Sequence, residues 1–314
     1  ARDRGRPSHD MNVLSIMLNR RGPARVATVM AVLLLGACGA EKTKTPAAHT
    51  AGTRPPRRVV CGSPAVAEIV FALDCGDRVV GVSDYTAYPP EACAKPGVGG
   101  LLNPNRERLL GLSPDMLVTQ GRHEALAAFA RTYGIRFQSV TLDTLADLDS
   151  AIRAIAETLG VAGQGRALAD GLRGELTAGG RTAPPRRVLL LLGRAPGVWT
   201  GLSTVGNGTF LGELLGLAGG TNVFADATGP YPHISKEALL VRQPEVILEV
   251  HPGGLTAGQQ ARLCADWHIF ADLPAVRQRR VHVLTNDFLL IPGPRVRQTA
   301  RILAAAIGGE ARSE

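Results

Sequence analysis

The chain has 314 residues, of which 45% are hydrophobic. This length and composition suit a globular protein of about two domains. The formal net charge is +8, but residues 1–58 account for all of it, with 11 Lys and Arg against 3 Asp and Glu, and the remainder holds 24 charges of each sign. A neutral body lacks the basic surface that phosphate neutralisation requires, so the composition argues against a nucleic-acid-binding protein.

The N-terminal region has the features of an export signal. After a candidate start at Met11 or Met17, arginines precede an apolar run over residues 26–35, and small residues follow. This order is typical of a secretory signal. The run is too short to span about 30 Å of hydrocarbon as a helix, although a plain membrane anchor or a buried core helix is the alternative. We expect a signal-peptide region over residues 1–37, with no readable signal in residues 1–10.

The signal ends in Leu35-Gly36-Ala37-Cys38, which resembles a bacterial lipobox. That resemblance implies cleavage before Cys38 and attachment of lipid to its sulfur. Residues 38–56 are rich in Thr, Ala, Lys, Gly and Pro without an apolar period, so they predict a flexible tether. We therefore expect an exported protein, lipid-anchored to the bacterial cell envelope and facing the periplasm or the outer face of the membrane.

Four cysteines remain in the body, and outside the cytoplasm an even number permits disulfides. They are Cys61, Cys75, Cys93 and Cys264. We favour a Cys75–Cys93 pair, because these two flank one predicted strand. Four reduced thiols that pack as small apolar side chains are the alternative. The spacing fits no zinc pattern, so no metal site is predicted.

An internal repeat divides the body into two similar halves. Residues 105–118 and 235–248 repeat the same pattern at the same spacing. Each begins with a helix-capping residue, continues with a Glu and a Leu-Leu pair, breaks at a Pro and ends in a buried strand. Weaker echoes link residues 76–84 with 219–226 and residues 57–60 with 186–189. Two similar α/β lobes are predicted.

Apolar runs and helical periods alternate along both halves, which favours mainly parallel sheets. The expected strands are 59–61, 79–82, 116–119, 137–141, 188–192, 246–250 and 281–284. Residues 145–159 and 164–178 have helical periodicity between the halves. We predict an α/β protein of two Rossmann-like lobes joined by a long rigid helix, which should limit lobe closure. The predicted boundaries are 57–163 for the N-terminal lobe, 164–183 for the connecting helix, 184–308 for the C-terminal lobe and 309–314 for a tail.

Motifs typical of enzymes are missing from the sequence: there is no GxSxG, P-loop, HExxH or kinase signature. Gly206-Asn207-Gly208 begins like a dinucleotide loop, but the next glycine, Gly212, comes one residue too late. Five histidines occur singly, at His123, His233, His251, His268 and His282. The sequence therefore predicts no catalytic residues and no enzyme.

Several segments resemble a known family. They are Gly81-Val82-Ser83-Asp84-Tyr85, Tyr88-Pro89-Pro90-Glu91-Ala92, Gly99-Gly100 and Asn103-Pro104-Asn105. These segments resemble the cobalamin-binding proteins of ABC importers, which belong to the helical-backbone metal-chelate receptors. The resemblance extends over residues 57–307. It implies two α/β lobes, joined by a long helix, that hold the ligand in the cleft between them.

The same resemblance implies a set of ligand-binding positions. Tyr85 would line the cleft from the N-terminal lobe. The other lobe would contribute Trp199, Tyr231, Asp287, Phe288, Leu289, Leu290 and Ile291. Aromatic rings and a few polar groups suit the flat apolar face and amide edges of a corrinoid. This chain departs from the family where aliphatic residues occupy the 287–291 loop and position 101, and core packing is the alternative for each aromatic.

Glu107 and Glu237 occupy equivalent positions of the repeat. By resemblance, each docks against arginines of one subunit of an ABC permease dimer, which works with its ATPase. The alternative is that each acidic side chain steadies the first turn of its own helix.

The sequence thus predicts a substrate-binding lipoprotein of an ABC importer that captures cobalamin, a cobalt corrinoid, or a related corrinoid. It is expected to act as a monomer with no cofactor of its own and to deliver its ligand to the permease. An iron-siderophore or heme receptor of the same fold is the first alternative. A structural or adhesion lipoprotein of the envelope is the second.

Overall fold

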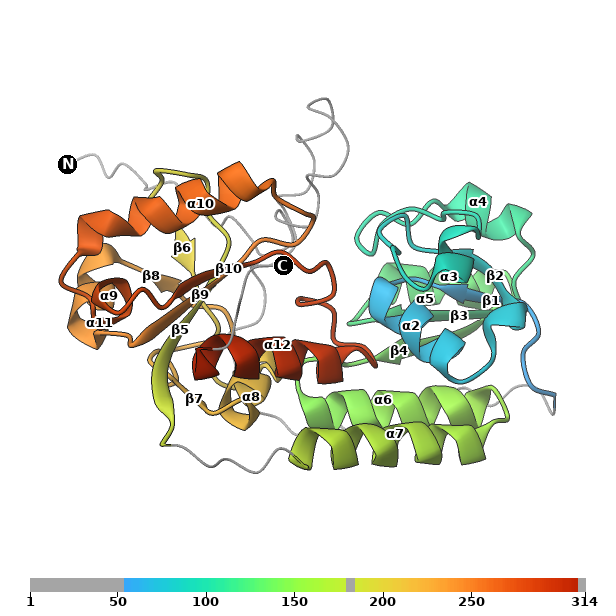
Figure 1. Cartoon of the computed structure of the whole chain (residues 1–314). Coiled ribbons are helices and arrows are strands. Elements are labelled where there is room, and N and C mark those ends of the chain that lie inside the picture. The colour runs from blue at the N-terminus through green and yellow to red at the C-terminus, as the bar shows by residue number, and fades with distance from the viewer. Residues whose placement is uncertain (1–53, 179–183, 310–314) are drawn as a thin grey trace, which may run out of the picture.

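A computed structural model describes residues 54–178 and 184–309. The predicted signal region, Cys38 and most of the predicted tether lie outside the described residues. The rest folds into two α/β lobes that lie side by side, the N-terminal lobe in blue to green and the C-terminal lobe in yellow to red (Figure 1). Among the described helices, none has the length and apolar character needed to cross a membrane.

The N-terminal lobe contains a four-stranded sheet in the order β2-β1-β3-β4, and every pairing in it is parallel. Its strands are β1 (Val59–Cys61), β2 (Val79–Val82), β3 (Met116–Gln120) and β4 (Arg136–Val140). Its helices are α2 (Pro64–Ala72), η1 (Gly76–Arg78), α3 (Pro90–Cys93), α4 (Arg106–Gly111) and α5 (Glu124–Thr132).

The C-terminal lobe contains a second parallel sheet in the order β10-β9-β5-β7, beside a two-stranded antiparallel pair of β6 and β8. Its strands are β5 (Arg186–Leu192), β6 (Leu202–Ser203), β7 (Gly220–Asn222), β8 (His233–Ile234), β9 (Val246–Val250) and β10 (Val281–Leu284). Its helices are α8 (Phe210–Leu217), α9 (Lys236–Arg242), α10 (Ala257–Asp266), η2 (Trp267–Phe270), α11 (Pro274–Arg277) and α12 (Val296–Gly308).

The two sheets share one topology, which confirms the predicted pair of similar lobes. The strand order β2-β1-β3-β4 of the N-terminal sheet corresponds, strand by strand, to the order β7-β5-β9-β10 of the C-terminal sheet. The helix before the third strand is capped in the same way in each lobe, because Asn105 accepts a hydrogen bond from the Arg108 amide at 3.0 Å and Ser235 accepts one from the Ala238 amide at 3.2 Å. Apolar residues fill both faces of strands such as β5, which is apolar and buried from Val188 to Leu192, as expected for parallel sheets covered by helices.

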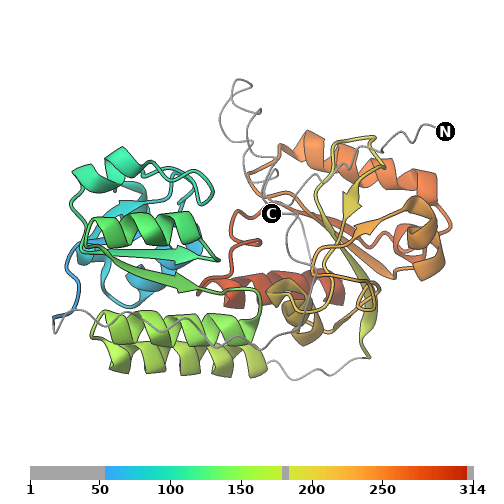
Figure 2. The same ribbon diagram turned by 180° about the vertical axis from the view of Figure 1, so that it is seen from behind.

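Two antiparallel helices, α6 (Leu145–Thr158) and α7 (Ala162–Thr177), run beneath the N-terminal lobe and connect it to the other lobe (Figures 1 and 2). The residue before the α6 cap already touches the C-terminal lobe, since the Phe210 amide donates to the Asp143 carbonyl at 2.6 Å. Near the end of α7, Glu175 pairs with Arg297 and Arg301 of α12 at 3.0 and 3.1 Å. The helix pair is therefore fastened to the C-terminal lobe at both its entry and its exit.

The predicted Cys75–Cys93 disulfide is wrong, because the four cysteines in the described part of the chain are free thiols. Cys75 is buried in the core and donates to the Leu73 carbonyl, whereas Cys93 ends the short helix α3 at the surface. Cys75 therefore lies in the core and Cys93 lies at the surface, so the two thiols do not meet. Burial raises the pKa of the Cys61 thiol to about 12, so this thiol is an apolar core group.

Candidate functional site

Segments that follow the carboxyl ends of the strands carry the contacts between the lobes. In the N-terminal lobe, the segment after β2 carries Tyr88 and the segment after β4 carries Asp143. The segment after β10 crosses toward the N-terminal lobe before α12 begins (Figure 1). In open α/β sheets, ligands bind beside the carboxyl ends of the strands. The candidate site therefore lies on these segments.

Tyr85 lies three residues after the end of β2 and is 43% exposed. The preceding residue, Asp84, exchanges two hydrogen bonds of 3.0 Å with Gly99, one through its amide and one through its carboxylate. A Cβ atom on Gly100 would lie 2.6 Å from the Tyr85 ring, so glycine allows this loop to pass against the ring. Burial, together with the charge of Asp84, raises the pKa of the Tyr85 phenol.

Tyr88 joins the site although its role was missed in the sequence. Tyr88 is 42% exposed, and the Arg295 guanidinium lies 4.2 Å from its ring centroid. On the other lobe, the Phe288 ring centroid lies 4.9 Å from the same guanidinium. Arg295 is thus held between an aromatic ring of each lobe, at a distance suited to cation–π attraction.

The same arginine forms a buried ion pair across the lobes. Its Nη2 atom lies 2.6 Å from Oε1 of Glu68, a residue of α2. Burial raises the pKa of Glu68 although the hydrogen bond from Arg295 opposes this shift. Both side chains are almost fully enclosed, so neither charge can be left alone without a large desolvation cost. We call this pair the interlobe ion pair.

The predicted binding loop 287–291 divides into two parts. Asp287 and Phe288 are partly exposed, and Asp287 lies 3.5 Å from Arg295. Leu289, Leu290 and Ile291 are only 1, 7 and 7% exposed and belong to the main apolar core. In this structure the three aliphatic residues support lobe packing, and the first two positions carry the accessible surface.

Trp199 lies on the loop after β5 and is partly buried against other aromatic rings. Its ring forms edge contacts with Trp267 and Phe270, with centroids 4.9 and 4.7 Å away. The Arg194 guanidinium lies 4.0 Å from the Trp199 centroid. These three contacts leave the Trp199 indole little rotational freedom.

The group that holds Trp199 is a buried charge network, which we name by its centre, Glu249. This carboxylate, in the middle of the apolar strand β9, lies 3.3 Å from Arg194, 2.7 Å from His251 and 2.8 Å from the Trp267 indole nitrogen. Arg194 also pairs with Asp266 at 2.9 Å, and this hydrogen bond lowers the pKa of Asp266. Both carboxylate oxygens of Glu249 have polar partners, which offsets the cost of burying its charge inside the lobe.

Tyr231 precedes β8 and is 38% exposed. Burial, with a smaller contribution from the charge of Asp143, raises the pKa of its phenol to about 12. The hydroxyl therefore remains protonated at neutral pH and can donate a hydrogen bond. Because Asp143 follows the last strand of the N-terminal lobe, Tyr231 lies near the junction of the lobes.

Glu107 and Glu237 are the second residues of α4 and α9, and both are exposed. Neither forms an ion pair with a residue that the structure describes. The backbone amide of Glu237 and the Ser235 hydroxyl lower the pKa of Glu237, so its carboxylate stays ionised in solution. No group of three or more His, Cys, Asp or Glu side chains in residues 54–178 and 184–309 has the geometry of a metal site.

Residues 59–288 match the family model described as periplasmic binding protein, which is well over half of the chain. This chain belongs to the periplasmic binding protein family. Members of this family are substrate-binding proteins.

Proteins named for vitamin B12 binding and proteins named for heme binding are both similar to this chain. The chain is 30% identical over 246 residues to the vitamin B12-binding protein of Vibrio cholerae serotype O1, a match covering 77% of this chain and 85% of the relative. The solved vitamin B12-binding protein of Vibrio cholerae superimposes with a TM-score of 0.65 at 27% identity, over 82% of this chain and 99% of that chain. A periplasmic heme-binding protein from Roseiflexus sp. RS-1, solved in apo form, gives 0.67 at 29% identity with the same coverage.

Proposed function

We propose that this protein captures cobalamin or a related corrinoid between its lobes and delivers it to the permease of an ABC importer. The observation that supports the proposal is the set of partly exposed aromatic side chains on loops of both lobes, where Tyr88 and Phe288 flank Arg295 at the contact between the lobes. Tyr85 and Tyr88 come from the N-terminal lobe, and Trp199 and Tyr231 from the C-terminal lobe. Flat apolar faces suit such rings, and the polar edges of a corrinoid suit the carboxylate of Asp287 and the phenol of Tyr231.

Heme is the second candidate ligand, because solved heme-binding proteins resemble this chain as closely as the solved vitamin B12-binding protein does. Titration of the purified body with cyanocobalamin, hemin and a ferric siderophore, followed by calorimetry and absorbance, separates the two. We expect tightest binding of cyanocobalamin at one ligand per chain. Tighter binding of hemin would favour the second candidate, and binding of none of them would overturn both.

Tyr85→Ala and Trp199→Ala test where the ligand binds. Each change removes apolar contact worth about 1 to 3 kcal/mol, so the dissociation constant should rise by roughly 5 to 150-fold. Tyr133→Ala is a matched control, because Tyr133 is an aromatic residue 55% exposed at the end of α5. Unchanged calorimetric affinity in both test variants would remove these rings from the site.

Delivery should depend on Glu107 and Glu237. If arginines of two permease subunits receive these carboxylates, charge-assisted pairing orients the complex and is weakened by salt. Reversing both to Arg should abolish transport while the purified protein still binds its ligand, and a single reversal should do less harm. Normal transport by the double variant would favour the helix-steadying role alone.

Anchoring to the envelope should depend on Cys38. Cys38→Ala should leave an unlipidated precursor whose body still folds and binds ligand, because Cys38 precedes the predicted tether and lies 19 positions before the predicted body begins at residue 57. Metabolic labelling with a fatty acid would detect the lipid, and a fully labelled variant would contradict the assignment.

A further inference from the structure

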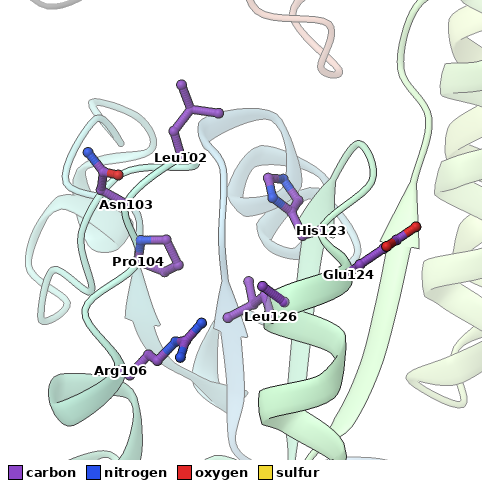
Figure 3. A pocket seen from close by; sticks show the side chains of 8 residues that line it. Leu102, Asn103, Pro104, Arg106, His123, Glu124 and Leu126 are labelled. Carbon is purple, nitrogen blue, oxygen red and sulfur yellow. The ribbon is translucent and has the colours of Figure 1, made fainter. Parts of the chain in front are cut away.

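The two lobes hold their loops in different ways at the carboxyl ends of the strands. In the N-terminal lobe, a hollow of about 410 Å³ separates the segment that leads into α4 from the start of α5, which follows β3 (Figure 3). In the C-terminal lobe, the loop after β5, residues 193–201, is instead joined by hydrogen bonds to the end of α10. This second loop carries Trp199, so its attachment bears on the proposed site.

The Trp199 loop is rich in residues with a mobile backbone. Three of the residues 193–201 are glycine, which has the most backbone freedom of all residues. The loop is closed by a turn in which the Val198 amide donates to the Ala195 carbonyl at 3.0 Å, and Gly197 stands in that turn with a φ of +74°. A fixed position for Trp199, two residues later, therefore depends on contacts outside the loop.

Asp266 supplies two of these contacts. It is the last residue of α10, and its Oδ2 atom accepts hydrogen bonds from the Gly197 amide at 2.6 Å and from Arg194 Nη1 at 2.9 Å. The hydrogen bond from Arg194 lowers the pKa of Asp266, so its carboxylate is ionised at neutral pH. The C-terminal end of a helix disfavours an anion. The carboxylate therefore serves the loop rather than its own helix.

Arg194 carries the restraint from Asp266 to the indole ring. Its side chain is 2% exposed, and its Nη2 atom also donates to the Leu263 carbonyl of α10 at 3.0 Å. The guanidinium lies 4.0 Å from the Trp199 centroid, within the range of cation–π attraction. Trp199 is thus restrained through its backbone and at the face of its ring, and one oxygen of Asp266 serves both restraints.

Glu249 holds the same guanidinium, but its replacement would test the fold rather than the binding role. Glu249 is fully buried within β9, whereas the side chain of Asp266 is 20% exposed at the edge of the network. Asp266 can therefore be changed while the core of the lobe stays intact.

We propose that Asp266 is a positioning residue for ligand capture, which keeps the Trp199 indole in the orientation that receives the chelate. The inference rests on the proposed function, in which Trp199 contacts the ligand. Asp266 acts through Gly197 and Arg194, and a ring that is already ordered avoids the entropy loss of being ordered on binding. Loss of this preorganisation should raise the dissociation constant about 2 to 12-fold, as expected for ordering one side chain.

A double-mutant cycle tests the proposal by calorimetric titration with cyanocobalamin. The proteins are wild type, Asp266→Asn, Trp199→Ala and the variant with both changes. Asp266→Asn should weaken binding about 2 to 12-fold when Trp199 is present, and by less than about twofold when Trp199 is absent, because its effect passes through that ring. Asp272→Asn is the matched control, since Asp272 is an exposed carboxylate after η2 in the same lobe, and it should bind as tightly as wild type.

Near-ultraviolet circular dichroism of the unliganded protein gives a second readout. Trp199 and Trp267 meet edge to face at an interplanar angle of 83°. A fixed pair of indoles contributes ellipticity, which motion of one ring reduces. We expect a smaller signal in Asp266→Asn and an unchanged one in Asp272→Asn. If Asp266→Asn does not fold, Asp266→Glu replaces it in the cycle, since it keeps the charge and moves it by one methylene, and the same dependence on Trp199 is expected.

The outcomes separate this inference from the proposed function. If cyanocobalamin binds and Asp266→Asn matches wild type in affinity and dichroism, the positioning role is wrong and the proposed function stands. Equal weakening by Asp266→Asn with and without Trp199 also overturns the positioning role, because the residue would then act on the ligand or the fold directly. If only hemin binds, the same cycle with hemin decides. If no chelate binds, both proposals fail.

Discussion

The two lobes share a strand order but use it differently at the carboxyl ends of their strands. In the N-terminal lobe, Tyr85 and Tyr88 stand on loops with glycine beside one ring and a guanidinium beside the other. In the C-terminal lobe, Trp199 is backed by a charge network built around Glu249, which is fully buried within β9. The repeat thus defines the sheets, while the loop residues of each lobe define how its aromatic surface is held. The C-terminal lobe uses more buried charged side chains than the N-terminal lobe to hold its aromatic surface.

Removing the centre of the Glu249 network should have the largest effect on stability. Glu249→Ala leaves Arg194 buried without one of its carboxylate partners, and breaking a buried ion pair costs about 3 to 5 kcal/mol. Urea unfolding would measure the loss in the free energy of unfolding. Glu157→Ala, an exposed change on α6, should stay within about 0.5 kcal/mol. A loss below about 1 kcal/mol in Glu249→Ala would show that the network is not a main support of its lobe.

Weakening the interlobe ion pair should have a smaller effect. Glu68→Gln keeps one acceptor for Arg295 but removes its charge, so we expect a loss of about 1 to 3 kcal/mol. Thermal and urea unfolding would report the change, with Glu91→Gln on α3 as an exposed control in the same lobe. Equal stability of the two variants would mean that the interlobe ion pair contributes nothing net.

Acid should separate the partly exposed carboxylate of Asp266 from the buried carboxylate of Glu68. The pKa of Asp266 is lowered by Arg194, so its stabilisation is present above the ordinary value near about 4 and is lost as the pH falls through the folded value. Asp266→Asn should therefore flatten the acid decline in the free energy of unfolding. The pKa of Glu68 is raised by burial, so its contribution has the opposite slope, and Glu68→Gln should steepen the decline. Unfolding series from about pH 3 to 7 would show it, and parallel curves would contradict both assignments.

The repeated helix caps should give the smallest and most similar effects. Asn105→Ala and Ser235→Ala each remove one side-chain acceptor from the first turn of equivalent helices, at a cost of about 1 kcal/mol. Urea unfolding should give losses that agree within about 0.5 kcal/mol. A clear difference would indicate that one helix is held mainly by its packing rather than by its cap.

Much of the fold was predictable because apolar runs and caps are local signals. The strand pattern and the 105–118 and 235–248 repeat anticipated both parallel sheets except for the edge strand β7, whose Gly-Thr-Asn sequence has no apolar residue. The strands β6 and β8 were also missed, because two residues give no period. The contacts of Glu68 with Arg295 depend on residues 227 positions apart, which no local pattern specifies. Glu249 did carry a signal, since a lone carboxylate inside Val-Ile-Leu-Glu-Val suggests a buried and partnered charge.

The candidate site was predictable only where it lies in family motifs. Tyr85, Glu107 and Glu237 lie in segments that the resemblance covers, and the structure leaves their side chains exposed. Leu289 to Ile291 could not be assigned from sequence, because an apolar loop residue can face a ligand or the core. Tyr88 lay within a quoted motif, but its pairing with Arg295 becomes visible only when the lobes are assembled.

The close contact of Trp199 with Trp267 has an optical consequence. The chain contains 2 tryptophans, and both lie in the C-terminal lobe with ring centroids 4.9 Å apart. Tryptophan emission of the protein therefore originates in one lobe, beside the surface where we propose that the chelate binds. A corrin or porphyrin absorbs light in the range that indoles emit, so a bound chelate should quench this emission by energy transfer. The receptor thus carries its own unlabelled reporter of occupancy, which allows loading and release to be followed in real time.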